Sequence, residues 1–158
     1  MKRVLPIVII LIGILLRWYY INWSLPDFFH PDEVRPLYAV QEISWENLNP
    51  KFFAYGSLPI YLLKILHETG KAISPHANFF LIGRALSAFF SSLTLIVLYR
   101  FGKRFFSKQV ALFSTTFLAF TVLHIQLSHF LTVDVMLTFF ILLTVYFSTS
   151  IVKSFVIF

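Results

Sequence analysis

The 158-residue sequence contains no cysteine. A disulfide framework and thiol chemistry are therefore excluded, because both require the cysteine sulfur. Charge is also scarce, since 13% of the residues are Asp, Glu, Lys or Arg, whereas a soluble domain has about 25%. Hydrophobic residues make up 58% of the chain and the mean hydropathy is +0.80. This composition predicts an all-α, polytopic membrane protein.

The net charge of +6 does not indicate nucleic acid as a partner. A nucleic-acid surface gathers basic residues on one face, whereas here they flank apolar segments, as the positive-inside rule describes for membrane proteins. The clustered basic residues are Lys2, Arg3, Arg100, Lys103, Arg104 and Lys108. We therefore expect a lipid bilayer, and no nucleic acid, around this chain.

Four segments are apolar enough to be membrane spans, each of which needs about 20 mainly apolar residues. They cover residues 4–21, 79–99, 109–124 and 133–152. Arg17, near the end of the first segment, is expected to extend outward to water. A cleaved signal peptide is the alternative for this segment, but its aromatic flank lacks the small residues of a cleavage site.

The basic flanks also predict an orientation for one transmembrane domain formed by residues 1–158. The N-terminus, the turn at residues 100–108 and Lys153 are expected in the cytoplasm. The loop at residues 22–78 and the turn at residues 124–134 then lie on the extracytoplasmic side.

Acidic residues number only seven, and six of them fall between positions 27 and 68. The seventh, Asp134, stands alone in a long apolar tract at the start of the fourth span. Because carboxylates are costly near a bilayer, their confinement to one side indicates where chemistry takes place.

The long loop is predicted to hold two amphipathic helices lying along the membrane surface. In the first, His30 is the N-cap, Pro31 the first helical residue, and Asp32 and Glu33 complete the first turn. The second is expected to begin with Ser57 as N-cap and to end at Gly70.

The carboxylates have two interpretations. Asp32 and Glu33 are either ordinary first-turn acids or a general base with its support. The pair, with His30, also offers ligands to a divalent cation. Asp134 is either a first-turn acid of its span or a second carboxylate facing the same cavity as Asp32.

Three further side chains are candidates for substrate binding. Arg84, inside the second span, is either a snorkelling residue or a contact for a phosphate group, which its planar fork suits. Tyr55 belongs to a helix-entry turn, 55–59, that could equally shape a sugar or lipid pocket. His129 lies on the acidic side with His30 and His124, where a histidine–carboxylate metal site is an open alternative.

The ordered motifs resemble a known family. The segments 30–33, 49–62, 83–87, 99–104 and 128–134 are similar to the start of GT-C superfamily glycosyltransferases that use polyprenyl-phosphate sugars. The protein O-mannosyltransferase-like and aminoarabinose-transferase-like branch is the nearest group. The resemblance covers nearly the whole chain in the right order.

The resemblance implies a catalytic Asp at Asp32, a further acid at Asp134 and, less directly, a phosphate-binding Arg84. It also implies sugar transfer from a polyprenyl-phosphate donor to an extracytoplasmic protein, lipid or glycan, usually with inversion. Such enzymes have more spans than this sequence, and the apolar run continues to Phe158. We therefore expect the chain to be the N-terminal part of such an enzyme. A second chain could supply the missing spans.

Two other hypotheses stay open. One is a non-catalytic membrane subunit that binds lipid or a partner protein. The other, a transporter, is weaker because its polar groups would lie near mid-membrane. The sequence predicts no definite cofactor beyond the open alternative of a divalent cation.

Overall fold

The computed structural model describes residues 4–27 and 29–156, and every regular element in that part of the chain is helical. The predicted all-α fold is therefore confirmed. Lys2 and Arg3, which support the predicted orientation, lie outside the described residues. The elements are α1 (Val4–Trp18), the short 3-10 helix η1 (Pro31–Glu33), α2 (Val34–Glu42), α3 (Ser57–Ile73), α4 (Phe79–Phe105), α5 (Lys108–Phe120), α6 (Val122–Ser128) and α7 (Asp134–Val156).

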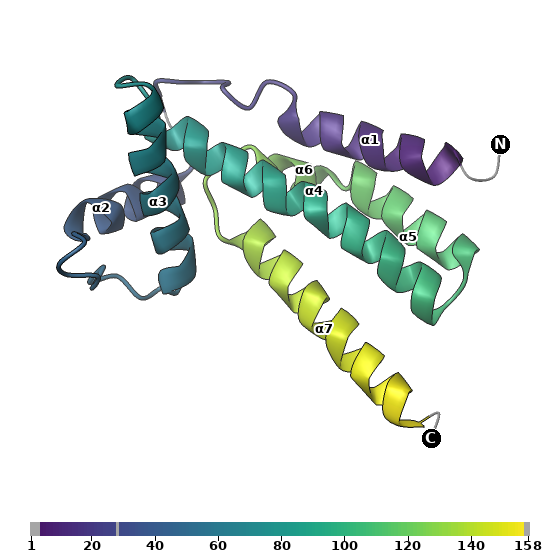
Figure 1. Cartoon of the computed structure of the whole chain (residues 1–158). Helices are drawn as coiled ribbons and strands as arrows, with labels where there is room; N and C mark the ends of the chain where they lie inside the picture. Colours follow the sequence, from purple (N-terminus) through teal and green to yellow (C-terminus); the bar gives the residue numbers. More distant parts are fainter. Residues whose placement is uncertain (1–3, 28, 157–158) are drawn as a thin grey trace.

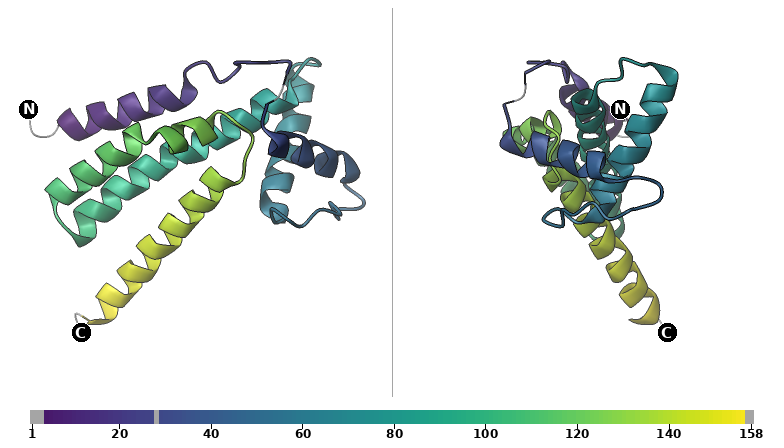
Figure 2. Two further views of the ribbon diagram at one scale, coloured as in Figure 1. Left: turned by 180° about the vertical axis from the view of Figure 1, so that it is seen from behind. Right: turned by 90° about the vertical axis from the view of Figure 1, so that its left-hand side faces the viewer.

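Helix α4 is the centre of the molecule (Figure 1). Its 27 residues extend about 40 Å at 1.5 Å per residue. Helices α1 and α5 pack against α4 and against each other, while α7 contacts α4 from another side and diverges toward its own C-terminus (Figure 2). Small residues allow the close approach: a Cβ on Gly102 would lie 2.7 Å from the Cα of Ala111 in α5.

Within the described residues, two helices, α4 and α7, are long and apolar enough to cross a membrane. The predicted third span is broken instead, because α5 and α6 meet at an angle of 58°. If this bent pair forms one span, the number rises to three. The predicted first span is the apolar α1, which at 15 residues is shorter than the others.

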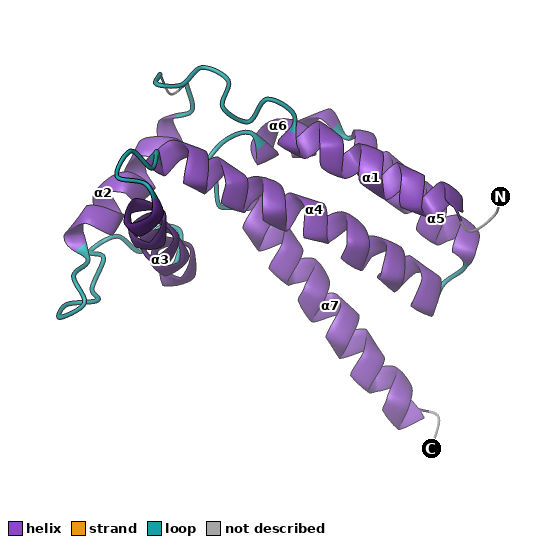
Figure 3. Cartoon of the chain, turned by 45° about the horizontal axis from the view of Figure 1, so that its top comes forward, coloured by secondary structure: helices purple, strands orange, loops and turns teal. Residues whose placement is uncertain are grey.

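The helices of the long loop lie across the end of α4 at which that helix begins (Figure 3). Their predicted positions in the sequence are confirmed with two boundary corrections, while their place along a membrane surface stays a prediction. Gly56, with φ of 70°, takes the N-cap place expected for Ser57, and α3 continues past Gly70 to Ile73. Gly70 faces the side chains of Ile82 and Ala77 instead of ending the helix.

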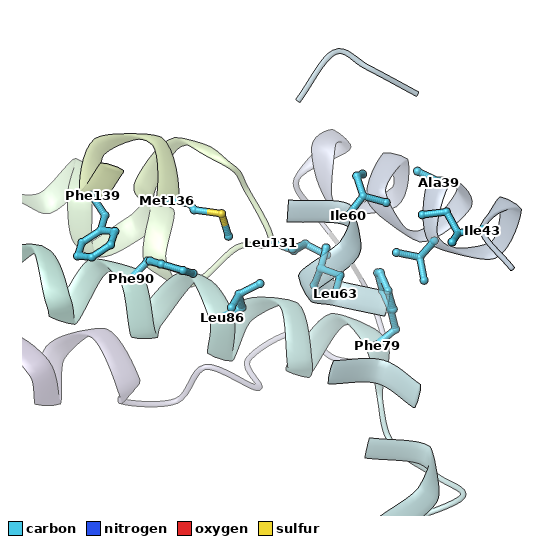
Figure 4. Packing of buried hydrophobic residues seen from close by; sticks show 11 residues of the cluster. Ala39, Ile43, Ile60, Leu63, Phe79, Leu86, Phe90, Leu131, Met136 and Phe139 are labelled. Atoms are coloured by element: carbon cyan, nitrogen blue, oxygen red, sulfur yellow. The ribbon is translucent and has the colours of Figure 1, made fainter. Parts of the chain in front are cut away.

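One hydrophobic core joins the loop to the long helices (Figure 4). Ile60 and Leu63 from α3 are almost completely buried between α2 and the first turns of α4. Figure 4 also shows Leu131, from the segment before α7, and Met136, from the first turn of α7, on the side of α4. The core therefore fixes the acidic loop against the beginnings of α4 and α7.

Helix α4 extends beyond the predicted limit at residue 99. It runs through Arg100 and Arg104 and ends at Phe105, so the polar connection to α5 is only Phe106 and Ser107. Arg and Lys are good helix formers and their charges complement the negative C-terminal end of a helix, which explains the extension.

Candidate functional site

The acidic motif folds as a single tight turn. The His30 ring accepts a hydrogen bond from the Asp32 backbone nitrogen at 3.3 Å, and Pro31 occupies the first helical position, as predicted. Successive residues of such a turn project in different directions. Glu33 is consequently buried, with no exposed surface, whereas the Asp32 side chain is 45% exposed.

Glu33 is bound to Arg84 of α4 as a two-point ion pair. The Nε and Nη2 atoms of Arg84 donate to the two carboxylate oxygens at 2.8 and 3.0 Å, and both side chains are completely buried. Oε1 of Glu33 also accepts the backbone N–H of Leu131 at 3.0 Å. The pair thus connects the acidic turn, α4 and the segment before α7.

The remaining donors of Arg84 are also occupied. Its Nη1 donates to the carbonyls of Trp23 at 2.7 Å and Ile21 at 3.4 Å, and its Nη2 approaches Ser24 Oγ at 3.5 Å. A guanidinium has five N–H donors, so none is directed at a ligand. The snorkelling alternative for Arg84 is wrong, since its side chain has no exposed surface. Its predicted phosphate contact stays a prediction, and for that contact Arg84 would have to release some of these partners and bind the phosphate instead.

Two other predicted residues, Asp32 and Asp134, act electrostatically on Tyr55. Burial, a side-chain hydrogen-bonding interaction with Asp32 and the charge of Asp32 raise the pKa of Tyr55 from 10.0 to about 12. The charge of Asp134 acts in the same direction. Asp134 is exposed in the first turn of α7. Two carboxylates and one phenol, separated by up to 102 positions in the sequence, are therefore electrostatically coupled.

Arg35 is the cation of this cluster, and sequence reasoning missed it. Its positive charge opposes the effect of Asp32 on Tyr55. The Arg35 side chain is exposed, and no carboxylate forms an ion pair with it among the described residues. The available signal was its spacing of three residues from Asp32, which places both on one side of a helical turn.

An apolar groove of about 330 Å³ begins at Tyr55. One wall is the entry to α3, with Leu58 and Pro59, and the other is the start of α7, with Leu137 and, just before the helix, Val133 among its lining residues. Tyr55 thus connects the polar cluster to a groove that is lined by the first turns of α7. Such a shape suits a ligand with a charged head and a hydrocarbon tail.

His129 is placed apart from these groups. Its Nδ1 lies 2.8 Å from the carbonyl oxygen of Ile125, and its Nε2 lies 2.9 Å from that of Tyr19. Both ring nitrogens therefore face the backbone, and substrate binding by His129 stays a prediction.

The candidate metal ligands do not converge. Glu33 turns inward to Arg84, while His30 Nδ1 lies 3.8 Å from Asp32 Oδ2. In residues 4–27 and 29–156 no three His, Asp or Glu side chains form a group that could hold a metal ion. A divalent cation accordingly stays a prediction.

A second buried arginine explains the bent pair of helices. Arg17 has no exposed surface, so the expected outward extension is wrong. Its Nη2 donates to the carbonyl of Leu118 at 2.9 Å, and its Nη1 to the carbonyls of Ala119 at 3.2 Å and Gly13 at 2.8 Å. Carbonyls at a helix end lack the usual intrahelical partners, and Arg17 donates to two of them at the end of α5, of which that of Leu118 also accepts the N–H of Thr121 at 3.3 Å.

The contacts of Arg17 extend to α4 and α6. Its Nε donates to Ser91 Oγ at 2.7 Å, and its Nη2 lies 3.1 Å from Nδ1 of His124, which is also 2.9 Å from Ser91 Oγ. All five donors are again used, here without any carboxylate. His124 is thereby held within the helix bundle and does not join a metal site.

A model of one protein family matches half of the chain. The family is described as dolichyl-phosphate-mannose-protein mannosyltransferase, and the match covers residues 76–155. This range includes Arg84, His129 and Asp134, while Asp32 and Tyr55 precede it. Comparison with curated proteins and with solved structures gives no match.

Proposed function

Because this chain belongs to the dolichyl-phosphate-mannose-protein mannosyltransferase family, a family of membrane glycosyltransferases, we propose that it acts in sugar transfer from a polyprenyl-phosphate donor. The acceptor is a hydroxyl or amine on the extracytoplasmic side. The observation that supports the proposal is the electrostatic coupling of Asp32 and Asp134 to Tyr55, which lines an apolar groove.

In the proposed reaction, Asp32 is the general base. Its exposed carboxylate takes the proton of the acceptor while the acceptor oxygen or nitrogen attacks the anomeric carbon of the sugar. The bond between that carbon and the phosphate oxygen breaks, and the polyprenyl phosphate leaves with the bonding electrons. Asp134 serves as a second acid that orients the sugar or the acceptor.

The leaving phosphate requires a positive partner. Arg84 is engaged by Glu33, so we assign the contact to Arg35, which is exposed and electrostatically coupled to the same cluster. A guanidinium directed at a phosphate stabilises the charge that develops as the ester bond breaks. Glu33 and Arg84 then act as positioning residues that hold the turn carrying Asp32.

The base assignment is tested by replacing Asp32. We expect Asp32→Asn to lower consumption of polyprenyl-phosphate mannose in proteoliposomes by about a hundredfold or more, the usual contribution of a general base. Asp27→Asn is the matched control, because Asp27 is an exposed carboxylate of the same loop outside the cluster. Consumption by Asp32→Asn close to that of the control would remove the assignment. Donor binding without consumption in the unaltered chain would favour a non-catalytic membrane subunit.

The groove assignment is tested on α7. Leu137 lines the groove and is 57% exposed, whereas Ile141, 55% exposed one turn later, is not among the lining residues. Leu137→Trp should fill the groove and raise the KM for donor by about tenfold, equivalent to about 1.4 kcal/mol. Ile141→Trp is the matched control. An equal KM in the two variants would show that the tail binds elsewhere.

A further inference from the structure

The end of the molecule farthest from Asp32 carries a different cluster. Helix α4 extends about 40 Å from the acidic loop to its C-terminus. Five basic residues gather near that end, on three helices, and all are exposed. They are Arg100, Lys103, Arg104, Lys108 and Lys153. Within the described residues, none of the five forms an ion pair with a carboxylate.

Two of the five cations are held against aromatic rings. The Arg104 guanidinium lies 5.5 Å from the ring centres of Phe105 and Tyr146, and its Nη1 donates to the Tyr146 hydroxyl at 3.1 Å. The Lys153 ammonium lies 5.8 Å from the ring centre of Phe105. Helices α4 and α7 thus present a guanidinium and an ammonium around one aromatic pair.

The part of α7 that carries Tyr146 and Lys153 also exposes apolar side chains. Phe147, Ile151 and Val152 of α7 are each between 55% and 60% exposed. A soluble anion would make no use of such a surface, whereas the acyl chains of a lipid would cover it. The combination of fixed cations and exposed hydrocarbon side chains fits a phospholipid with a negative headgroup.

We propose that Arg104 and Lys153, set against Phe105 and Tyr146, form a binding site for the headgroup phosphate of an anionic phospholipid. The site is separate from the proposed transfer site and does not depend on it. General attraction of basic residues to a negative membrane surface would treat all five cations alike. The aromatic contacts instead single out these two.

The test measures which lipid contacts this end of the molecule. Phe106→Trp, at a position 66% exposed, supplies a reporter in the chain reconstituted in vesicles. Brominated phosphatidylglycerol and brominated phosphatidylcholine quench that reporter when they lie next to it, and the signal of the native tryptophans is subtracted. We expect at least a fivefold preference for phosphatidylglycerol, the factor that one surface cation supplies, and a smaller preference at high salt.

Two double variants that each lose two charges separate the site from general attraction. Arg104→Gln with Lys153→Gln should reduce the preference to near one, while Lys103→Gln with Lys108→Gln should keep more than half of it. Equal losses, or no preference in the unaltered chain, would overturn the proposal. Displacement of the lipid by millimolar inorganic phosphate would do so as well.

A third variant covers the case in which the first double variant does not fold, as judged by its circular dichroism. Tyr146→Phe keeps every charge and the ring, and removes only the hydroxyl that holds Arg104. We expect about a twofold loss of preference. An unchanged preference would contradict the fixed position of Arg104.

Discussion

Two arginines are buried in the described part of the chain, and their positive charges are stabilised by different kinds of partner. Arg84 and Arg17 both lack exposed surface and both use all five donors. Arg84 is neutralised by the carboxylate of Glu33, whereas Arg17 is surrounded by backbone carbonyls, Ser91 and His124. A buried charge is costly unless it is paired and hydrogen-bonded.

The difference has a consequence for function. The pairing with Arg84 removes Glu33 from the acidic motif, so that Asp32 is left as its exposed carboxylate. The carbonyl partners of Arg17 have no such effect on a reactive group. They stabilise the end of α5 and hence the bend to α6.

The largest expected effect comes from breaking the ion pair. Glu33→Leu or Arg84→Met leaves one buried charge alone and should lower the free energy of unfolding by about 3–5 kcal/mol. Arg17→Met leaves no charge and should cost less, about 1–3 kcal/mol, for the carbonyls that lose a donor. Unfolding in mixed micelles, followed by circular dichroism, gives these values.

The double variant Glu33→Leu with Arg84→Met sharpens the contrast. Because two apolar side chains replace a buried ion pair at little net cost, it should recover most of the stability that either single change removes. Asp27→Asn is the control for loss of an exposed carboxylate. A larger loss of unfolding free energy in Arg17→Met than in Arg84→Met would show that the carbonyl-bound arginine contributes more to stability than the paired one.

A smaller effect is expected from the glycines beside the two arginines. A Cβ on Gly83 would lie 2.6–2.8 Å from three side-chain atoms of Leu131, whose backbone holds Glu33. A Cβ on Gly13 meets the tip of Leu95 at 2.7 Å and Ala119 at 3.1 Å. Gly83→Ala should therefore cost about 1–3 kcal/mol, and Gly13→Ala less, because the tip of Leu95 moves more readily than the branch of Leu131.

Both substitutions gain the same helix propensity, so their difference isolates the packing at each arginine. The same unfolding measurement compares them. Equal losses in the free energy of unfolding would mean that the side chain of Leu131 moves as readily as that of Leu95.

The smallest effect concerns the titration of Tyr55. Its pKa of about 12 reflects burial and the charge of Asp32, so Asp32→Asn should move the pKa toward 10. Because the folded pKa lies above the ordinary one, the neutral phenol contributes stability below pH 10 that is lost as pH rises through 12. Absorbance of the phenolate, with Tyr55→Phe as reference, follows the titration. An unchanged pKa of Tyr55 in Asp32→Asn would show that the Asp32 carboxylate does not act on the phenol.

Much of the fold followed from local features of the sequence. Apolar runs of helical length predicted α4 and α7, and Pro31 after His30 predicted the start of the acidic turn. The expectation that Asp32 and Asp134 share one end of the molecule agrees with their common effect on Tyr55. These features depend on hydropathy and on capping, which a few neighbouring residues specify.

Local sequence features predicted only part of the candidate site. Glu33 and Asp32 are adjacent and chemically alike, so no pattern separates the buried carboxylate from the exposed one. The helix break after Phe120 contains neither glycine nor proline, and depends on Arg17 about 100 positions earlier. The spacing of Arg35 from Asp32 was an available signal, but its electrostatic effect on Tyr55, 20 positions later, was not evident from the sequence.

By itself, the sequence determined an all-helical membrane chain with six of its seven acids in one loop and a separate cluster of bases near residues 100–108, because segment hydropathy and charge are local quantities. Tertiary structure decided which charged side chains are buried with partners and which stay exposed. Glu33 and Arg84 are 51 positions apart, and Arg17 and Ala119 are 102 apart. Partners at such separations are chosen by the packing of α1, α4 and α5, since a buried guanidinium takes whichever acceptors the packed helices bring within reach.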